Sequence, residues 1–129
     1  DERAQAYRKI ALRFGQPKFR RQLLEAYGYK CAITGYDLSD ALEAAHIVPY
    51  LGPDTNNVVN GLLLRSDIHS LFDRWLIAID TTTMSVVIHD NVKNSRYIEL
   101  SGRVLSVPDD PRKHPDKMAL DKHRSLSGI

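Results

Sequence analysis

Apolar residues recur at helical spacing in two segments near the start of the chain. The segment 2–13, ERAQAYRKIALR, is rich in residues that favour helix. Gly15 and Pro17 interrupt this segment, and Pro17 suits the first turn of another helix. The pattern predicts helices over residues 2–13 and 17–27, the second with an apolar face formed by Phe19, Leu23, Leu24 and Tyr27.

Short apolar runs then predict strands rather than helices. Residues 31–35 read as a short strand that ends in a turn, and residues 41–48 as a strand that contains His46. Pro, Gly, Asp and Asn are frequent over residues 49–57, which predicts a loop. The apolar run 58–64 predicts a further strand, interrupted by an Asn-Gly pair.

The pattern returns to helical spacing after this strand. Residues 66–74 predict a helix, which Ser66 or Asp67 can cap at its N-terminus. Residues 76–80 and 84–88 are two β-rich runs joined by a threonine-rich turn, and they predict a hairpin.

The C-terminal third is predicted with weaker signals. Residues 96–100 and 103–107 flank Ser-Gly and predict a second hairpin, and residues 116–125 favour a terminal helix. Together the elements predict an α+β fold, with N-terminal helices and a C-terminal β-hairpin extension.

Composition fits one ordinary folded domain of 129 residues, 43% hydrophobic and 26% charged. No apolar run approaches the roughly 20 residues that span a bilayer, so we expect no membrane partner and a cytoplasmic location. The one cysteine excludes an internal disulfide. We interpret residues 1–16 as an N-terminal helix ending a linker from an upstream domain, and residues 17–129 as the main domain.

Charge is spread unevenly along the chain. Residues 1–30 hold eight basic and three acidic side chains, a net charge of +5, whereas the whole chain carries +2. A basic arm beside a nearly neutral body suits a polyanion such as nucleic acid, although a solvated helix face has the same composition.

Four polar residues within one 28-residue stretch have the chemistry needed to hydrolyse a phosphodiester. That reaction needs a base that is neutral near pH 7, such as imidazole, and a divalent cation that stabilises charge. His46 fits the base, and Asn60 fits a residue that orients it. His69 and Asp73 are four residues apart on the predicted helix, so they share a face and fit metal ligands.

The motifs AAHIVPY, VVNGLLL and DIHSLFD carry these residues in order. His46 lies 14 residues before Asn60, Asn60 nine before His69, and His69 four before Asp73. This pattern resembles the HNH endonuclease family with its ββα-metal (His-Me finger) fold. The flanking segments KFRRQLLEAYGYKCAITG and LFDRWLIAID are similar to a bacterial subfamily found in restriction or defence proteins. The resemblance is strongest over residues 17–80.

The resemblance implies a metal-dependent DNA endonuclease that acts in restriction or defence. It implies that His46 is the general base and that Asn60 positions the histidine loop. His69 matches a ligand of one divalent cation, and Asp73 matches the position of a further ligand. We expect Mg or Mn as the cofactor, with Ni or Zn as alternatives.

Two departures from the family pattern affect the metal sites. Many members have Asp or His directly before the base, where this chain has Ala45. Either Glu43 approaches the cation, or Asp73 and water complete its shell. Many members also bind structural zinc through two Cys-x-x-Cys pairs, but here Cys31 is followed by Thr34. We therefore expect core packing in place of zinc.

DNA is the expected partner, and its backbone would be bound by salt-sensitive contacts that do not read sequence. Specificity would then come from an upstream DNA-recognition domain or from a homodimer. The expected DNA-binding residues are Lys18, Arg20, Arg21 and Arg65.

Two other functions remain open from the sequence. The absence of a ligand at Ala45 favours a DNA-binding module that is catalytically inactive. A hydrolase that uses Cys31 with His46 is a further alternative, because Lys30 could activate the thiol. Outside these sites we expect Phe72 and Trp75 in the core and the remaining histidines on the surface, namely His89, His114 and His123.

Overall fold

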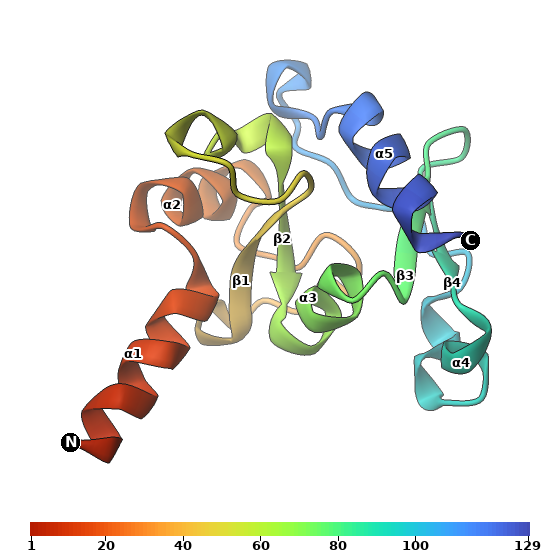
Figure 1. The fold of residues 1–129 in the computed structure, drawn as a ribbon. Coiled ribbons are helices and arrows are strands. Elements are labelled where there is room, and N and C mark those ends of the chain that lie inside the picture. Colours follow the sequence, from red (N-terminus) through yellow and green to blue (C-terminus); the bar gives the residue numbers. More distant parts are fainter.

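The computed structural model describes all of residues 1–129. Helices and strands alternate irregularly along the chain (Figure 1). The elements are α1 (Glu2–Phe14), α2 (Pro17–Ala26), β1 (Leu42–His46), β2 (Gly61–Arg65), α3 (Ser66–Asp73), β3 (Ile77–Asp80), β4 (Ser85–Ile88), α4 (Asp90–Lys93) and α5 (Lys117–Ser127).

A ββα unit forms the centre of the molecule. β1 and β2 pair antiparallel, with Leu42 opposite Arg65 and His46 opposite Gly61. α3 begins at the residue after β2, so it folds back beside the hairpin and contacts both strands. The predicted α+β fold with a ββα core is confirmed.

The two N-terminal helices differ in how they pack. α2 buries Phe19, Leu23 and Leu24 against the start of β2. Gly61 allows this contact, because a Cβ there would lie 2.7 Å from the Phe19 ring and 2.8 Å from Leu23. α1 buries none of its residues; its C-terminal end contacts β1, and its N-terminal part projects away from the rest of the chain (Figure 1).

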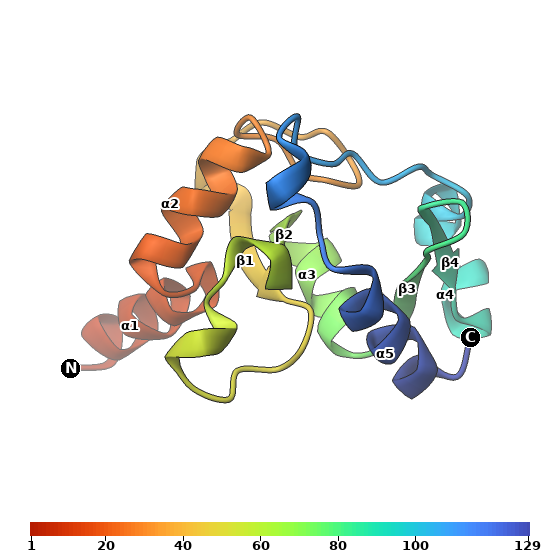
Figure 2. The ribbon, with the colours of Figure 1, turned by 90° about the horizontal axis from the view of Figure 1, so that it is seen from above.

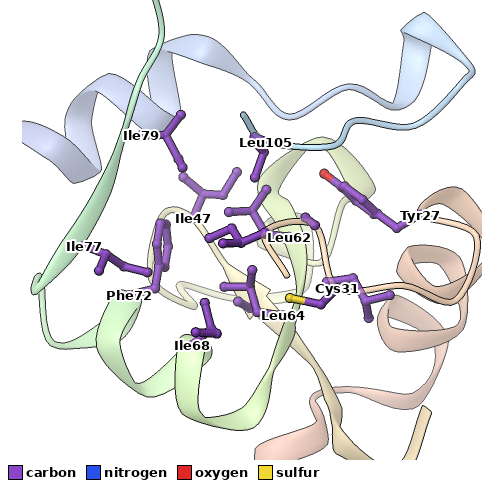
Figure 3. Close-up of a cluster of buried hydrophobic side chains, with 14 of the residues drawn as sticks. Tyr27, Cys31, Ile47, Leu62, Leu64, Ile68, Phe72, Ile77, Ile79 and Leu105 are labelled. Carbon is purple, nitrogen blue, oxygen red and sulfur yellow. The ribbon is translucent and has the colours of Figure 1, made fainter. Parts of the chain in front are cut away.

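One hydrophobic core joins the ββα unit to the C-terminal elements. Figure 3 shows β2, α3, β3 and the segment before α5 contributing side chains to it. Phe72, Ile68 and Leu64 are fully buried, and Cys31 is 1% exposed among them. Core packing therefore surrounds Cys31.

The first C-terminal hairpin, β3 with β4, is confirmed, whereas the predicted second hairpin is wrong. Residues Arg96–Leu100 form a 3₁₀ helix, whose N-terminus is capped by Ser95. Segment 102–105 instead bonds to the free edge of β4, through Gly102 N to Val86 O and Leu105 N to Met84 O. An edge strand offers unpaired backbone groups, and segment 102–105 bonds to those of β4 instead of pairing with residues 96–100.

Three local predictions are also corrected. Residues 31–35 form a turn, closed by a bond from Gly35 N to Cys31 O, and not a strand. Val58–Asn60 is a 3₁₀ turn that precedes β2. α3 starts without a side-chain cap, because its N-cap residue is Arg65; Ser66 is the first residue of the helix and its hydroxyl donates to Glu43.

Candidate active site

A groove of about 910 Å³ gathers the side chains that the sequence singled out. It lies between α1 and α5, which stand on opposite sides of β1 and α3 (Figure 2). His46, His69 and Asp73 all line it. Its basic lining residues are Arg8, Arg13 and Lys122, and its exposed aromatic ones are Tyr50 and Trp75.

His46 is held at the end of β1 by two contacts. Its ring stacks on Phe19, with centroids 4.6 Å apart and planes 16° from parallel. Its Nε2 lies 2.7 Å from Asn56 Oδ1. An amide oxygen only accepts hydrogen bonds, so Nε2 carries the proton in neutral His46. Nδ1 keeps its lone pair and is the atom that can accept a proton.

Asn60 fastens the loop that follows His46. Its Oδ1 accepts from Val48 N at 2.9 Å, and its Nδ2 donates to Val48 O and to Thr55 O, both at 3.1 Å. Its backbone oxygen also accepts from Ile47 N. One side chain thus ties both ends of the loop to the start of β2.

His69 is buried between two carboxylates. Its Nδ1 lies 2.6 Å from Glu43 Oε1, and its Nε2 lies 3.0 Å from Asp73 Oδ2. Glu43 is itself buried and accepts a second hydrogen bond, from Ser66 Oγ at 2.8 Å. Glu43 is therefore fixed on the inner side of His69, while Asp73 faces the groove.

These contacts shift two pKa values in opposite directions. Burial lowers the pKa of His69, but hydrogen bonds and attraction from Asp73 and Glu43 outweigh it and raise the pKa above its ordinary value. Burial raises the pKa of Glu43, but hydrogen bonds from His69 and Ser66 and the charges of His69 and Arg13 hold it below its ordinary value. Both shifts favour the charged forms, the carboxylate of Glu43 and the imidazolium of His69.

The groove offers a divalent cation two neighbouring donors and not a closed cage. No group of three or more His, Cys, Asp or Glu side chains in the chain is arranged to hold a metal ion. His69 Nε2 and Asp73 Oδ2 are, however, 3.0 Å apart. Two ligands at right angles around one ion, each at about 2.1 Å, would be separated by about 3.0 Å. Mg²⁺ commonly takes one or two protein ligands and keeps several waters.

None of the four predicted DNA-binding residues lines the groove. Lys18 and Arg21 are exposed on α2. The Arg20 guanidinium instead donates to Ser39 O at 2.7 Å and also to Leu42 O, which ties α2 to β1. Arg65 forms two hydrogen bonds to Asp67, at 2.6 and 2.9 Å, and lies over the Tyr36 ring.

Several expectations about nearby residues are corrected. Trp75 is 43% exposed and lines the groove, because it adopts a left-handed backbone conformation (φ 57°) after α3. His123 is buried, stacked on Phe72 at 3.7 Å, with its Nε2 bonded to Phe72 O. Cys31 is buried, does not line the groove and accepts bonds from two backbone N–H groups, which leaves the Cys/His hydrolase without support.

Three residues at the site were not assigned a role from the sequence. The sequence predicts a loop position for Asn56, leaves Glu43 between a structural and a ligand role, and places Arg13 only in the basic arm. For Glu43 a signal existed, because a carboxylate within the apolar run LEAAH is rarely buried without a partner. For Asn56 and Arg13 no local pattern pointed to the contact.

Comparison with known proteins agrees with this geometry. Residues 31–80 match the sequence profile of a family described as HNH endonuclease. No curated protein matches the chain by sequence. Among solved structures, the fold is similar to one titled "Modification dependent TagI restriction endonuclease", with a TM-score of 0.59 and 21% identity.

That match covers 82% of this chain and 36% of the other, so this chain spans about a third of its length. The profile match contains β1, β2 and α3 and all four residues of the predicted constellation. No helix is long and apolar enough to cross a membrane. Residues 31–80 therefore match the HNH endonuclease family by sequence, and the ββα fold of this segment agrees with that match.

Proposed function

We propose that this chain is the nuclease domain of a metal-dependent DNA endonuclease that hydrolyses phosphodiester bonds in restriction or defence. The observation that carries the proposal is the groove, in which His46 and the His69–Asp73 pair lie together. A base and a pair of cation ligands that open into one groove match what hydrolysis of a phosphodiester requires.

His46 acts as the general base through Nδ1. Asn56 holds the proton on Nε2, so Nδ1 is free to take a proton from the attacking water. Phe19 fixes the plane of the ring, and Asn60 fixes the loop that carries Asn56.

His69 and Asp73 would hold the divalent cation, and one imidazole with one carboxylate suits Mg or Mn. A bound cation supplies Lewis-acid stabilisation of the charge that develops on the phosphate oxygens. Glu43 accepts from Nδ1 of His69, which directs the Nε2 lone pair toward the groove once the Nε2 proton is lost. Glu43 is thus a positioning residue and not a ligand.

DNA binding is proposed to involve the exposed basic residues of α2. Lys18 and Arg21 are exposed on α2 and can contact flanking phosphates. Arg20 and Arg65 retain an intramolecular role, because their guanidinium groups are bonded within the chain. Recognition of particular sequences or modified bases is assigned to another domain or to a homodimer.

A catalytically inactive DNA-binding module is the second candidate function. It is favoured by Ala45, which is fully buried and offers no ligand, and by the absence of any cluster of three donors. The retained His46–Asn56 and His69–Glu43 hydrogen bonds favour the enzyme, because both serve catalysis and neither is needed to bind DNA.

Cleavage of supercoiled plasmid separates these two functions. The purified chain is incubated with Mg, Mn, Ni or EDTA, beside His46→Ala as the matched control. Metal-dependent nicking or linearisation that His46→Ala abolishes supports the endonuclease. Binding without cleavage in every metal, on both unmodified and methylated plasmid, supports the binding module.

A further inference from the structure

Trp75 lies in the groove at a backbone position that tryptophan rarely occupies. It comes two residues after the end of α3 and has a φ of 57°. Trp75 N donates to Phe72 O at 3.1 Å, and Leu76 N donates to Leu71 O at 2.9 Å. This pair of bonds closes a helix through a left-handed residue, which is usually glycine because a side chain is strained there. The end of the helix therefore does not explain why an indole stands at this position.

Packing of the hydrophobic core does not explain Trp75 either. The residue is 43% exposed and lines the groove with His46 and Asp73. It belongs neither to the buried core nor to the partly buried side chains that pack against that core. The indole therefore keeps a broad apolar face open to a ligand.

The surroundings of Trp75 suit a flat apolar ring that is joined to an anion. Apolar side chains on both walls line the groove, with Leu12 from α1 and Leu126 from α5. Apart from the histidines, three of its charged side chains are basic and one is acidic, namely Arg8, Arg13, Lys122 and Asp73. Its volume of about 910 Å³ lies within the range of roughly 300–1,000 Å³ that is typical of pockets for small molecules. A nucleobase with its phosphate combines the apolar ring and the negative charge in one unit.

We propose that Trp75 is a base-stacking residue, and that the groove receives one unpaired base of the DNA strand whose phosphate lies at the His69–Asp73 pair. The proposal rests on the proposed endonuclease function and narrows its substrate class. Stacking on an aromatic side chain requires a base that has left the duplex, because neighbouring bases cover both faces of a paired one. The preferred substrate is then single-stranded DNA, or a duplex with a mismatch beside the cleaved bond.

Binding measured without metal tests the stacking apart from cleavage. Trp75 is the single tryptophan of the chain, so tryptophan fluorescence reports on this residue alone. The chain is titrated in EDTA with three labelled ligands: a thymine oligonucleotide, an abasic sugar-phosphate chain of the same length, and a perfect duplex. Quenching of the Trp75 emission and anisotropy of the label are followed together.

Glycine variants remove the side chain without adding backbone strain. Trp75→Gly suits the φ of 57°, so the fold should be retained, and thermal unfolding checks this. Tyr29→Gly is the matched control, because Tyr29 is also left-handed (φ 61°), is 49% exposed and lies outside the groove. Trp75→Phe keeps an aromatic face at the same position.

We expect the thymine oligonucleotide to quench the Trp75 emission and the abasic chain to leave it unchanged. Trp75→Gly should weaken binding of the thymine oligonucleotide roughly 5- to 100-fold, the range for loss of one stacked base, and should not change binding of the abasic chain. Trp75→Phe should keep most of the affinity, and Tyr29→Gly should bind like the unsubstituted chain. With Mg²⁺, a mismatched duplex should be cut faster than its perfect counterpart, and Trp75→Gly should remove that difference.

Each contrary result overturns a distinct claim. An equal loss of affinity for the thymine and abasic chains would show that Trp75 contacts the DNA backbone and not a base. Unchanged emission and unchanged affinity would refute stacking altogether. A dimer in size-exclusion chromatography that Trp75→Gly dissociates would assign the apolar walls to a second copy of the chain. If the unsubstituted chain cuts no DNA in any metal, the endonuclease function fails, while the binding series in EDTA still decides the role of Trp75.

Discussion

Asn60→Ala is the substitution that most directly tests how the histidine loop is held. It removes three hydrogen bonds, to Val48 N, Val48 O and Thr55 O, and leaves the backbone bond from Ile47 N to Asn60 O in place. A hydrogen bond contributes about 1 kcal/mol net, so the free energy of unfolding should fall by about 3 kcal/mol. In a domain of this size that corresponds to a drop in Tm of roughly 10 °C.

Asn57→Ala is the matched control. Asn57 accepts a single bond, from Val59 N at 3.1 Å, in an exposed position. Its loss should reduce the free energy of unfolding by at most about 1 kcal/mol. Urea unfolding followed by circular dichroism gives both values. If Asn60→Ala is no more destabilising than Asn57→Ala, the three bonds do not hold the loop and the reasoning fails.

Three further substitutions probe the site and its support. Asn56→Ala removes the hydrogen-bond partner of His46 Nε2 and should lower the cleavage rate about 10- to 100-fold, with DNA affinity unchanged. An unchanged cleavage rate would show that Asn56 does not determine the tautomer of His46. Gly61→Ala should cost about 1–3 kcal/mol in urea unfolding, because its Cβ would lie 2.7 Å from the buried Phe19 ring, and a neutral result would contradict the close packing. Burial lowers the pKa of His123, so the folded state resists its protonation and stability should fall as pH drops below about 6.5. His123→Phe should flatten that decline, and an equal decline in both proteins would exclude His123 as its source.

The sequence alone predicted those features that depend on residues close together in the chain. The apolar runs on either side of a turn-rich loop predicted β1 and β2, and the i, i+4 spacing placed His69 beside Asp73. Both follow from periodicity, which depends only on near neighbours in the chain.

Contacts between distant segments could not be predicted in this way. Asn56 meets His46 because β1 and β2 bring the two ends of the loop together, and Arg13 meets Ser70 across 57 positions. Trp75 was expected in the core by its size, but its left-handed conformation turns the side chain out to the groove. The second hairpin was predicted wrongly because residues 102–105 bond to the edge of β4 and not to residues 96–100.

The stack of Phe19 on His46 links the chemistry of the groove to the packing of α2. Phe19 is fully buried, belongs to the hydrophobic core and touches the ring of the proposed base. Substitutions on the inner face of α2 should therefore change the rate of cleavage, although the substituted residues make no contact with DNA. A screen for loss of nuclease activity would recover such variants as apparent catalytic mutants. Their physical defect would be altered core packing that displaces the His46 ring.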